Sequence, residues 1–179
     1  MKIVEKGPNG IKIFKPKIFK DNRGYFYETL NVKKLSKILK KNFNIKQSNV
    51  SFSKKNVFRG FHFQKYPFAQ DKFVRVLQGK ILDILISIDK KSQIYLRSFS
   101  YEISEKNKKI LYVPKNFAHG FLVLSKNAII EYFVTDYYSH KHERNISIFD
   151  KRLNINKKII NRKLIMSDKD KTSNFYATY

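Results

Sequence analysis

The chain contains no cysteine, so three kinds of chemistry are closed to it. It can form no disulfide framework, no thiolate metal site and no cysteine nucleophile. It also lacks any apolar run long enough for the hydrophobic part of a signal peptide or for a bilayer span. A soluble, cytoplasmic protein with no membrane partner is therefore expected.

Acidic residues are scarce, with 14 Asp and Glu against 38 Lys and Arg, and the formal net charge is +24. A charge of this size raises the possibility of nucleic-acid binding. However, the lysines are spread from Lys2 to Lys171, and arginine, whose planar guanidinium suits base and phosphate recognition, is rare. We therefore expect no nucleic-acid partner, although a positive surface would attract an anionic substrate such as a diphosphate.

The remaining composition is that of a folded domain, because 42% of the residues are hydrophobic and 15% are aromatic. Most of the sequence is typical of short strands separated by turn signals. This pattern predicts an all-β sandwich or barrel, forming a single domain over residues 1–179. The candidate strands are residues 11–19, 24–30, 46–52, 58–64, 72–77, 81–88, 96–103, 109–113, 121–124 and 129–136.

One helix is predicted early in the chain. Asn31 is a plausible N-cap, and Val32, Leu35 and Leu39 recur after it at helical spacing among lysines. Such a basic amphipathic helix could lie on a membrane or bind a partner. We favour the simpler interpretation that its apolar stripe covers the edge of a sheet. The segment after His140 is mixed, and two short helices wrapping the barrel are one interpretation of it.

His62 is the first candidate for chemistry. In the predicted strand RGFHFQ, alternation places Phe61 and Phe63 on one face and His62 and Gln64 on the other. The polar pair could simply face solvent. Its neighbourhood favours a site, because the stretch between residues 47 and 75, which is largely predicted strand, also carries Gln47, Asn49, Arg59, Gln70, Lys72 and Arg75.

Two further candidates lie later in the chain. In AIIEYFVTDYY, alternation groups Tyr132 with Ile130 and Val134, which fits either a site residue or an ordinary core tyrosine. In NFAHGFLVL, His119 precedes a glycine at the start of a predicted strand. That position suits the mouth of a barrel, and a structural turn histidine is the alternative.

A metal site is not expected. The only His-x-His pair, His140 and His142, lies in the polar stretch SHKHE with no histidine after it, and His62 and His119 stand alone. The sequence also lacks a glycine-rich phosphate loop, a dinucleotide fingerprint and a G-x-S-x-G elbow.

Over nearly its whole length the chain resembles the dTDP-4-dehydrorhamnose 3,5-epimerases of deoxysugar biosynthesis. The combination of RGFHFQ, PFAQDKFVRV and FAHGF in this order is highly specific. The full set of matching stretches is FKDNRGYFYETL, QSNVSFSKKNVFRGFHFQKYPFAQDKFVRVLQGKILDI, VPKNFAHGF, EYFVTDYYSHKHE and MSDKDK.

The resemblance implies a double-stranded β-helix (a cupin-like jelly-roll barrel) with a few short flanking helices. It further implies a homodimer that acts on a dTDP-sugar and uses no metal or organic cofactor. His62 would be the general base, Tyr132 the general acid, Asp170 the carboxylate behind His62, and Lys72 the cation near the sugar C4 oxygen. Substrate contacts would come from Arg23, Glu28, Gln47, Asn49, Arg59, His119, Tyr138, Glu143 and Lys169.

The residue types suit this chemistry. Removing a proton from C3 or C5, which flank the C4 ketone, gives an enolate that a fixed ammonium can stabilise. Three alternatives stay open at this stage. They are a mono-epimerase acting at C3 or C5 of a related nucleotide-linked 4-keto sugar, a non-catalytic sugar-nucleotide binder, and a basic nucleic-acid-binding barrel.

Overall fold

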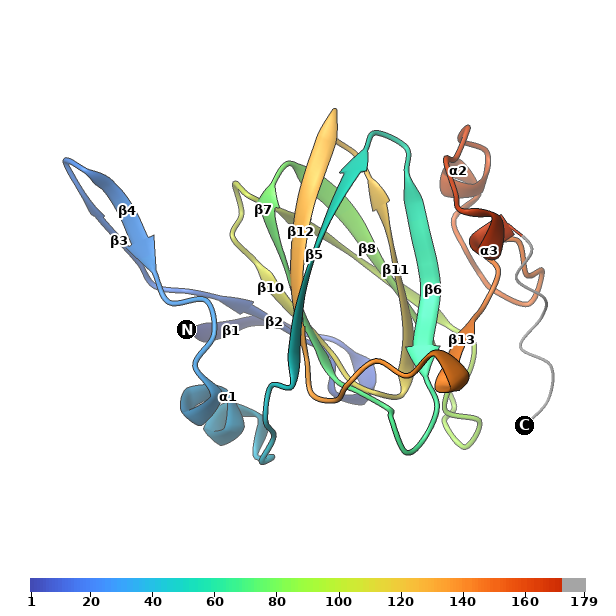
Figure 1. Cartoon of the computed structure of the whole chain (residues 1–179), viewed down its shortest axis with the longest axis horizontal. Helices are drawn as coiled ribbons and strands as arrows, with labels where there is room; N and C mark the ends of the chain where they lie inside the picture. Colours follow the sequence, from blue (N-terminus) through green and yellow to red (C-terminus); the bar gives the residue numbers. More distant parts are fainter. Residues whose placement is uncertain (172–179) are drawn as a thin grey trace.

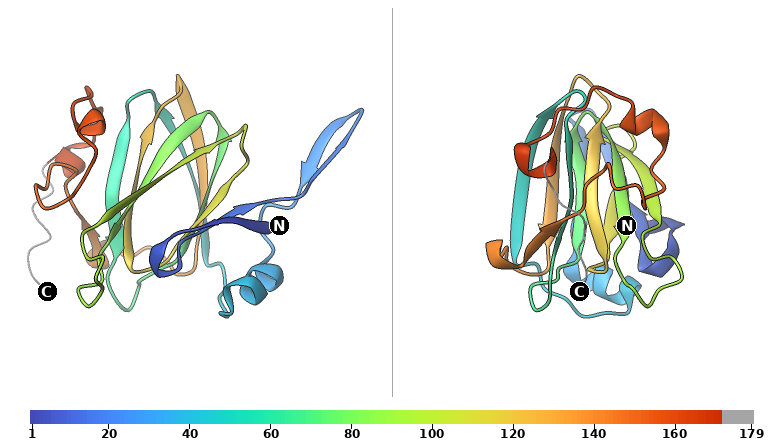
Figure 2. Two further views of the ribbon diagram at one scale, coloured as in Figure 1. Left: turned by 180° about the vertical axis from the view of Figure 1, so that it is seen from behind. Right: turned by 90° about the vertical axis from the view of Figure 1, so that its right-hand side faces the viewer.

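Two antiparallel sheets pack face to face in the computed structural model, which describes residues 1–171 (Figures 1 and 2). Residues 172–179 of the predicted domain lie outside the described residues. The six-stranded sheet has the order β1 (Lys2–Lys6), β2 (Lys12–Lys15), β10 (Ile110–Val113), β7 (Lys72–Gln78), β12 (Asn127–Val134) and β5 (Gln47–Lys54). The five-stranded sheet has the order β13 (Glu143–Asn145), β6 (Phe58–Gln64), β11 (Phe117–Val123), β8 (Lys80–Ser87) and β9 (Ser98–Ser104). This arrangement confirms the predicted all-β jelly-roll barrel.

Most predicted strands match observed ones, and the differences have physical causes. The predicted strand 11–19 is two strands, because Pro16 offers no amide hydrogen to a ladder and separates β2 from β3 (Ile18–Asp21). With β4 (Gly24–Tyr27), β3 forms a separate hairpin that projects from the body of the molecule (Figure 1). The placement of His119 at a strand start was wrong. β11 begins at Phe117 and is buried along its whole length, so it shows no alternation to mark its ends.

The early helix forms where it was predicted. In α1 (Val32–Leu39) the side chain of Asn31 accepts a hydrogen bond from the amide of Lys34 at 3.0 Å, as an N-cap does. Its buried Leu35 packs with Phe73 and other apolar side chains on the outward face of the six-stranded sheet. The expectation that the apolar stripe of the helix covers a sheet edge was therefore wrong. The outward face of β2, β10 and β7 is itself apolar, and α1 packs on that face and shields it from water.

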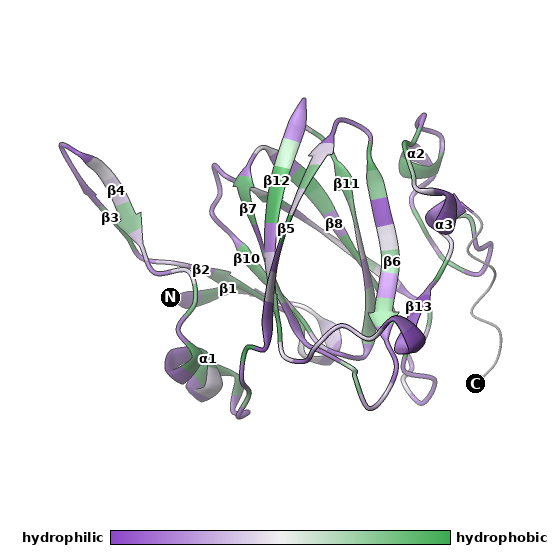
Figure 3. Ribbon diagram, in the orientation of Figure 1, coloured by the Kyte–Doolittle hydropathy of each residue, from purple (hydrophilic) through white to green (hydrophobic). Residues whose placement is uncertain are grey.

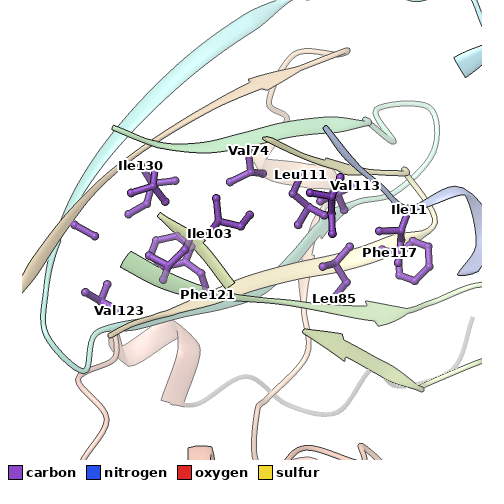
Figure 4. Close-up of a cluster of buried hydrophobic side chains, with 14 residues drawn as sticks. Ile11, Val74, Leu85, Ile103, Leu111, Val113, Phe117, Phe121, Val123 and Ile130 are labelled. Atoms are coloured by element: carbon purple, nitrogen blue, oxygen red, sulfur yellow. The ribbon is translucent and has the colours of Figure 1, made fainter. Parts of the chain in front are cut away.

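An apolar core fills much of the space between the sheets (Figure 4). Val74 and Ile130 from the six-stranded sheet meet Leu85 and Phe117 from the five-stranded sheet there, each almost fully buried. Removing large side chains of this kind would cost about 2–5 kcal/mol each. The core is continuous with the partly buried ring of Tyr132, so the candidate acid stands at the boundary between core and cavity.

The C-terminal segment wraps the outward face of the five-stranded sheet. Its apolar residues, with those of α2 (Lys157–Ile160), cover three phenylalanines of β6. Ile165 then pairs with Val57 next to β6, which brings α3 (Asp168–Lys171) over that strand. Two short 3-10 helices, Pro8–Gly10 and His140–His142, complete the elements. Within residues 1–171 no helix is both long and apolar enough to cross a membrane.

Candidate active site

A cavity of about 680 Å³ opens between the sheets, where β5, β7 and β12 face β6 and β11. This volume suits a small-molecule ligand. The strands and the C-terminal wrap all contribute to its wall. Its lining includes the predicted site residues Gln47, Asn49, Arg59, His62, Lys72, His119, Tyr132, Tyr138, Glu143 and Asp170.

β6 presents His62 and Gln64 to the cavity and Phe61 to the wrap, as the alternation predicted. Phe63 is buried in the same outer cluster as Phe61 but also borders the cavity. The strand accordingly alternates between hydrophilic and hydrophobic residues in Figure 3. A register irregularity between β6 and β11 shifts the alternation, so Arg59 also lines the cavity.

Two glycines let β6 and β11 approach closely at this irregularity. A Cβ atom on Gly60 would lie 2.6 Å from both the Cα of Gly120 and the carbonyl oxygen of His119, and Gly60 has a φ of +115°. No side chain fits there, and only glycine adopts that φ readily. The close approach holds His62 and His119 as directly paired residues of neighbouring strands.

His62 forms a close pair with Asp170 from α3. Its Nε2 lies 2.6 Å from Oδ1 of Asp170, a carboxylate that is 3% exposed. Burial alone would raise the pKa of Asp170, but hydrogen bonds from His62, Ser167 and Gly60 together with the His62 charge outweigh it, so the pKa is lowered. An ionised carboxylate can only accept, so Nε2 carries the hydrogen and Nδ1 is left as the basic nitrogen.

A second histidine–carboxylate pair lies beside the first. The Nε2 of His119 lies 2.8 Å from Oδ1 and 3.0 Å from Oδ2 of Asp83, which is fully buried on β8. Asp83 was not among the predicted site residues. The signal that could have identified it is an isolated acid inside the otherwise apolar stretch KILDILIS, since a buried charge requires a partner.

Lys72 brings a cation into the cavity. It is 9% exposed, and its Nζ lies 3.4 Å from the carbonyl oxygen of His62 on the opposite sheet. Burial lowers the pKa of Lys72 to about 8, against the opposing attraction of Asp83 and Glu143. The ammonium therefore predominates at pH 7 but is held in a poorly solvated position.

Tyr132 approaches the cavity from β12, in the sheet opposite His62. Ile130 and Val134 on the same strand are buried, as the sequence pattern predicted. Burial raises the pKa of Tyr132, with Arg59 opposing and Glu143 adding to the effect. The hydroxyl thus holds its proton firmly while facing an enclosed space.

The mouth of the cavity carries a cluster of hydrogen bonds. The hydroxyl of Tyr138 donates to Glu143 at 2.8 Å, which raises the pKa of Tyr138 to about 12, and Lys169 contacts the same carboxylate. Burial alone would raise the pKa of Glu143, but its bonds to Lys169 and Tyr138 lower it. Lys169 thus belongs to the mouth, next to Asp170 in sequence.

β5 lines the cavity with amide groups. The side-chain amide of Gln47 donates to Asn49 at 2.7 Å. Arg59 extends towards this strand from β6, and its Nε donates to Ser53 at 3.0 Å. Of the other polar residues noted in the sequence, Arg75 points away from the cavity and pairs with Glu131 at 2.5 Å.

Arg23 and Glu28 are predicted site residues that this chain does not bring to its own cavity, and Lys169 reaches it only through its contact with Glu143. Arg23 lies in the projecting β3–β4 hairpin, is exposed, and pairs with Asp21 at 2.6 Å. Glu28 follows the hairpin and accepts hydrogen bonds from Asn31 and Lys34. Their predicted contacts with substrate stay predictions.

The described residues offer no metal site, because residues 1–171 contain no cluster of three or more His, Asp or Glu side chains placed to hold an ion. The positions of the polar groups instead suit an organic ligand. A base, a phenol and an ammonium surround one enclosed space, with arginine and amide groups beside them.

Comparison with known proteins places the chain among sugar epimerases. The family model described as dTDP-4-dehydrorhamnose 3,5-epimerase matches residues 7–177. The enzyme of that name from Shigella flexneri is 37% identical over 170 residues, covering 95% of this chain and 93% of the relative. The one from Escherichia coli is 38% identical over 155 residues, covering 87% and 84%.

Solved structures agree. The dTDP-4-dehydrorhamnose 3,5-epimerase from Elizabethkingia anophelis matches with a TM-score of 0.91 and 36% identity, covering 98% of this chain and 96% of that one. The dTDP-6-deoxy-D-glucose-3,5-epimerase from Legionella pneumophila, in complex with dTDP-4-keto-L-rhamnose, matches with a TM-score of 0.89 and 34% identity, covering 97% and 92%. With the cavity and its paired groups, these matches show that the chain belongs to the dTDP-4-dehydrorhamnose 3,5-epimerase family.

Proposed function

We propose that this protein converts dTDP-4-dehydro-6-deoxy-D-glucose to dTDP-4-dehydro-L-rhamnose by inverting C3 and C5. The observation that carries the proposal is the His62–Asp170 pair on one wall of the cavity, with Tyr132 and Lys72 on the opposite sheet. The chemistry uses these side chains alone.

Proton removal is assigned to His62. Its Nδ1 removes a proton from the carbon beside the ketone. The electrons of the broken C–H bond remain and form an enolate with its charge on the C4 oxygen. Asp170 holds the imidazole in the tautomer that leaves Nδ1 basic and then stabilises the imidazolium.

Stabilisation of the negative charge on the C4 oxygen is assigned to Lys72. Its ammonium is nine-tenths buried, so its charge acts on the C4 oxygen with little screening by water. A contact with the same end of the sugar is assigned to His119, which is held by Asp83 on the neighbouring strand β8.

Proton return is assigned to Tyr132. The raised pKa of its hydroxyl keeps the proton in place until the enolate forms. Delivery from the face opposite His62 inverts the carbon and leaves a protonated His62 and a deprotonated Tyr132. Solvent then takes the proton from His62 and returns one to Tyr132, and repetition at the second carbon completes the reaction. The nucleotide and its diphosphate are assigned to Arg23, Glu28, Gln47, Asn49, Arg59, Tyr138, Glu143 and Lys169.

Reaction in deuterated water tests the proposal. Each inversion replaces a carbon-bound hydrogen with one from solvent, so NMR of the product should show deuterium at both C3 and C5. Label at one carbon would identify a mono-epimerase instead. No label, with dTDP still raising the melting temperature, would identify a non-catalytic binder. The His62→Ala variant is the control and should leave both positions unlabelled.

We further infer a homodimer. Val50, Phe52 and Leu77 are exposed on the outward face of the six-stranded sheet, and the β3–β4 hairpin adds exposed Phe19 and Phe26. A second copy would cover such surfaces. It would also give Arg23 and Glu28 a cavity to enter, namely that of the partner, since they lie outside the cavity of their own chain.

Subunit complementation tests the shared site. Arg23→Ala and His62→Ala homodimers should each have low activity. A mixed dimer contains one site with both residues intact, so mixing and exchanging the two variants should restore activity. If the mixture stays inactive although subunit exchange between the two variants has been demonstrated, Arg23 does not act in the partner's cavity.

A further inference from the structure

Asp71 is a buried carboxylate that immediately precedes Lys72 and has no part in the chemistry proposed above. It is 2% exposed. Its Oδ2 accepts hydrogen bonds from Lys41 at 2.5 Å and from the hydroxyl of Tyr112 at 3.1 Å, and its Oδ1 accepts from the amide of Lys115 at 3.0 Å. Two distant segments of the chain, one at Lys41 and one at residues 112–115, therefore meet on this side chain.

The backbone of Asp71 is held on the opposite flank. Its amide donates to the hydroxyl of Thr135 at 2.9 Å, and its carbonyl oxygen accepts from the amide of Thr135 at 3.2 Å. Tyr112 and Lys115 belong to the β10 side of β7, and Thr135 follows β12 on the other side. The residue before Lys72 is thus fixed from both neighbouring strands.

The head of Lys72 has little to hold it. Its one hydrogen bond among the described residues, to the carbonyl oxygen of His62, is long at 3.4 Å. A lysine side chain is flexible, and burial makes its charged head costly to keep in place. The position of Nζ in the cavity must therefore depend on where the backbone of β7 begins.

We propose that Asp71 is a positioning residue for Lys72, fixing the start of β7 so that the ammonium meets the ketone oxygen of the substrate. The inference rests on the proposed function, because it requires Lys72 to act in the reaction. It assigns to the Asp71 carboxylate a role in turnover that goes beyond stability.

A double-mutant cycle tests the inference. Asp71→Ala should lower kcat about 10-fold to 100-fold, as expected when a catalytic group moves by about 1 Å, with the affinity for dTDP unchanged. In a Lys72→Met background the same substitution should lower kcat no further, since the group that it positions is already gone. Asp71→Asn, which keeps one acceptor oxygen for the amide of Lys115, should show a smaller effect of the same kind.

The control for simple destabilisation is Asp150→Asn. Asp150 is also a buried carboxylate, is 5% exposed and pairs with Arg152, but it does not line the cavity. It should lower the melting temperature without lowering kcat. If Asp71→Ala is too unstable to assay, Tyr112→Phe and Asp71→Asn replace it in the cycle.

The inference would be overturned if Asp71→Ala lowered kcat by the same factor in the wild-type and Lys72→Met backgrounds. It would also be overturned if Asp71→Ala kept the kcat of the wild type. If Lys72→Met itself keeps full activity, the role proposed for Lys72 fails, and the role of Asp71 fails with it. The cycle therefore separates failure of the proposed function from failure of the positioning role.

Discussion

Replacing Lys72 with methionine is expected to make the protein more stable while nearly abolishing turnover. Methionine has a similar length and shape, and Lys72 is only 9% exposed, so the substitution fills the same space. It removes a charge that the fold keeps at a cost. The same charge is what the proposed reaction uses to stabilise the enolate.

The size of the stability gain follows from the pKa. Burial lowers the pKa of Lys72 from 10.5 to about 8. At about 1.4 kcal/mol per pH unit, the charged form is disfavoured by about 3 kcal/mol in the folded state. Below pH 8 the lysine is charged in both states and the full cost applies. Between pH 8 and 10.5 only the unfolded chain binds the proton, so wild-type stability rises with pH and the gain shrinks.

Urea unfolding of wild type and Lys72→Met at pH 7 and pH 9.5, at one fixed protein concentration, measures the difference. We expect Lys72→Met to be more stable by up to about 3 kcal/mol at pH 7, with a smaller gap at pH 9.5. kcat should fall about 100-fold to 1000-fold. The control Lys106→Met, at an exposed turn position away from the proposed dimer surface, should change stability by less than about 0.5 kcal/mol. A less stable Lys72→Met, or a gap that does not change with pH, would refute the reasoning.

Three further substitutions test other parts of the account. Asp170→Asn should lower kcat by about 10²-fold to 10⁴-fold with little change in dTDP affinity, since an amide no longer enforces the reactive tautomer of His62; near-normal kcat would show that Asp170 has no such role. Tyr132→Phe should impair product formation more than solvent exchange, and NMR in deuterated water would contradict this if both disappear together. Gly60→Ala should lower the free energy of unfolding by at least about 2 kcal/mol, because its Cβ would lie 2.6 Å from backbone atoms of β11; unchanged denaturant stability would disprove the tight fit.

The fold class was predictable because the two sheets have clear hydrophobic faces. The alternation in RGFHFQ correctly separated Phe61 from His62 and Gln64, whereas Phe63 borders both the outer cluster and the cavity. β11 was placed poorly because it is buried on both faces, which removes the period-two signal. The position of α1 on a sheet face was also missed, since its amphipathic pattern shows that a face is covered without showing which one.

The candidate site was only partly predictable. Residue alternation explains why His62 and Tyr132 point inwards, but no local pattern shows that they belong to opposite sheets. Asp170 lies 108 positions from His62 in the chain, and only the C-terminal wrap brings them together. Asp83 and Asp71 gave no local pattern beyond an acid within or beside a strand, because their partners come from distant segments.

The most direct test is a crystal structure of the protein with a bound dTDP-4-keto sugar. The hexose should lie with Nδ1 of His62 on one face of the ring and the hydroxyl of Tyr132 on the other, each within about 3.5 Å of a carbon beside the ketone. The Lys72 ammonium should contact the C4 oxygen. A sugar bound with both side chains on the same face, or with the ring outside their reach, would contradict the proposed inversion.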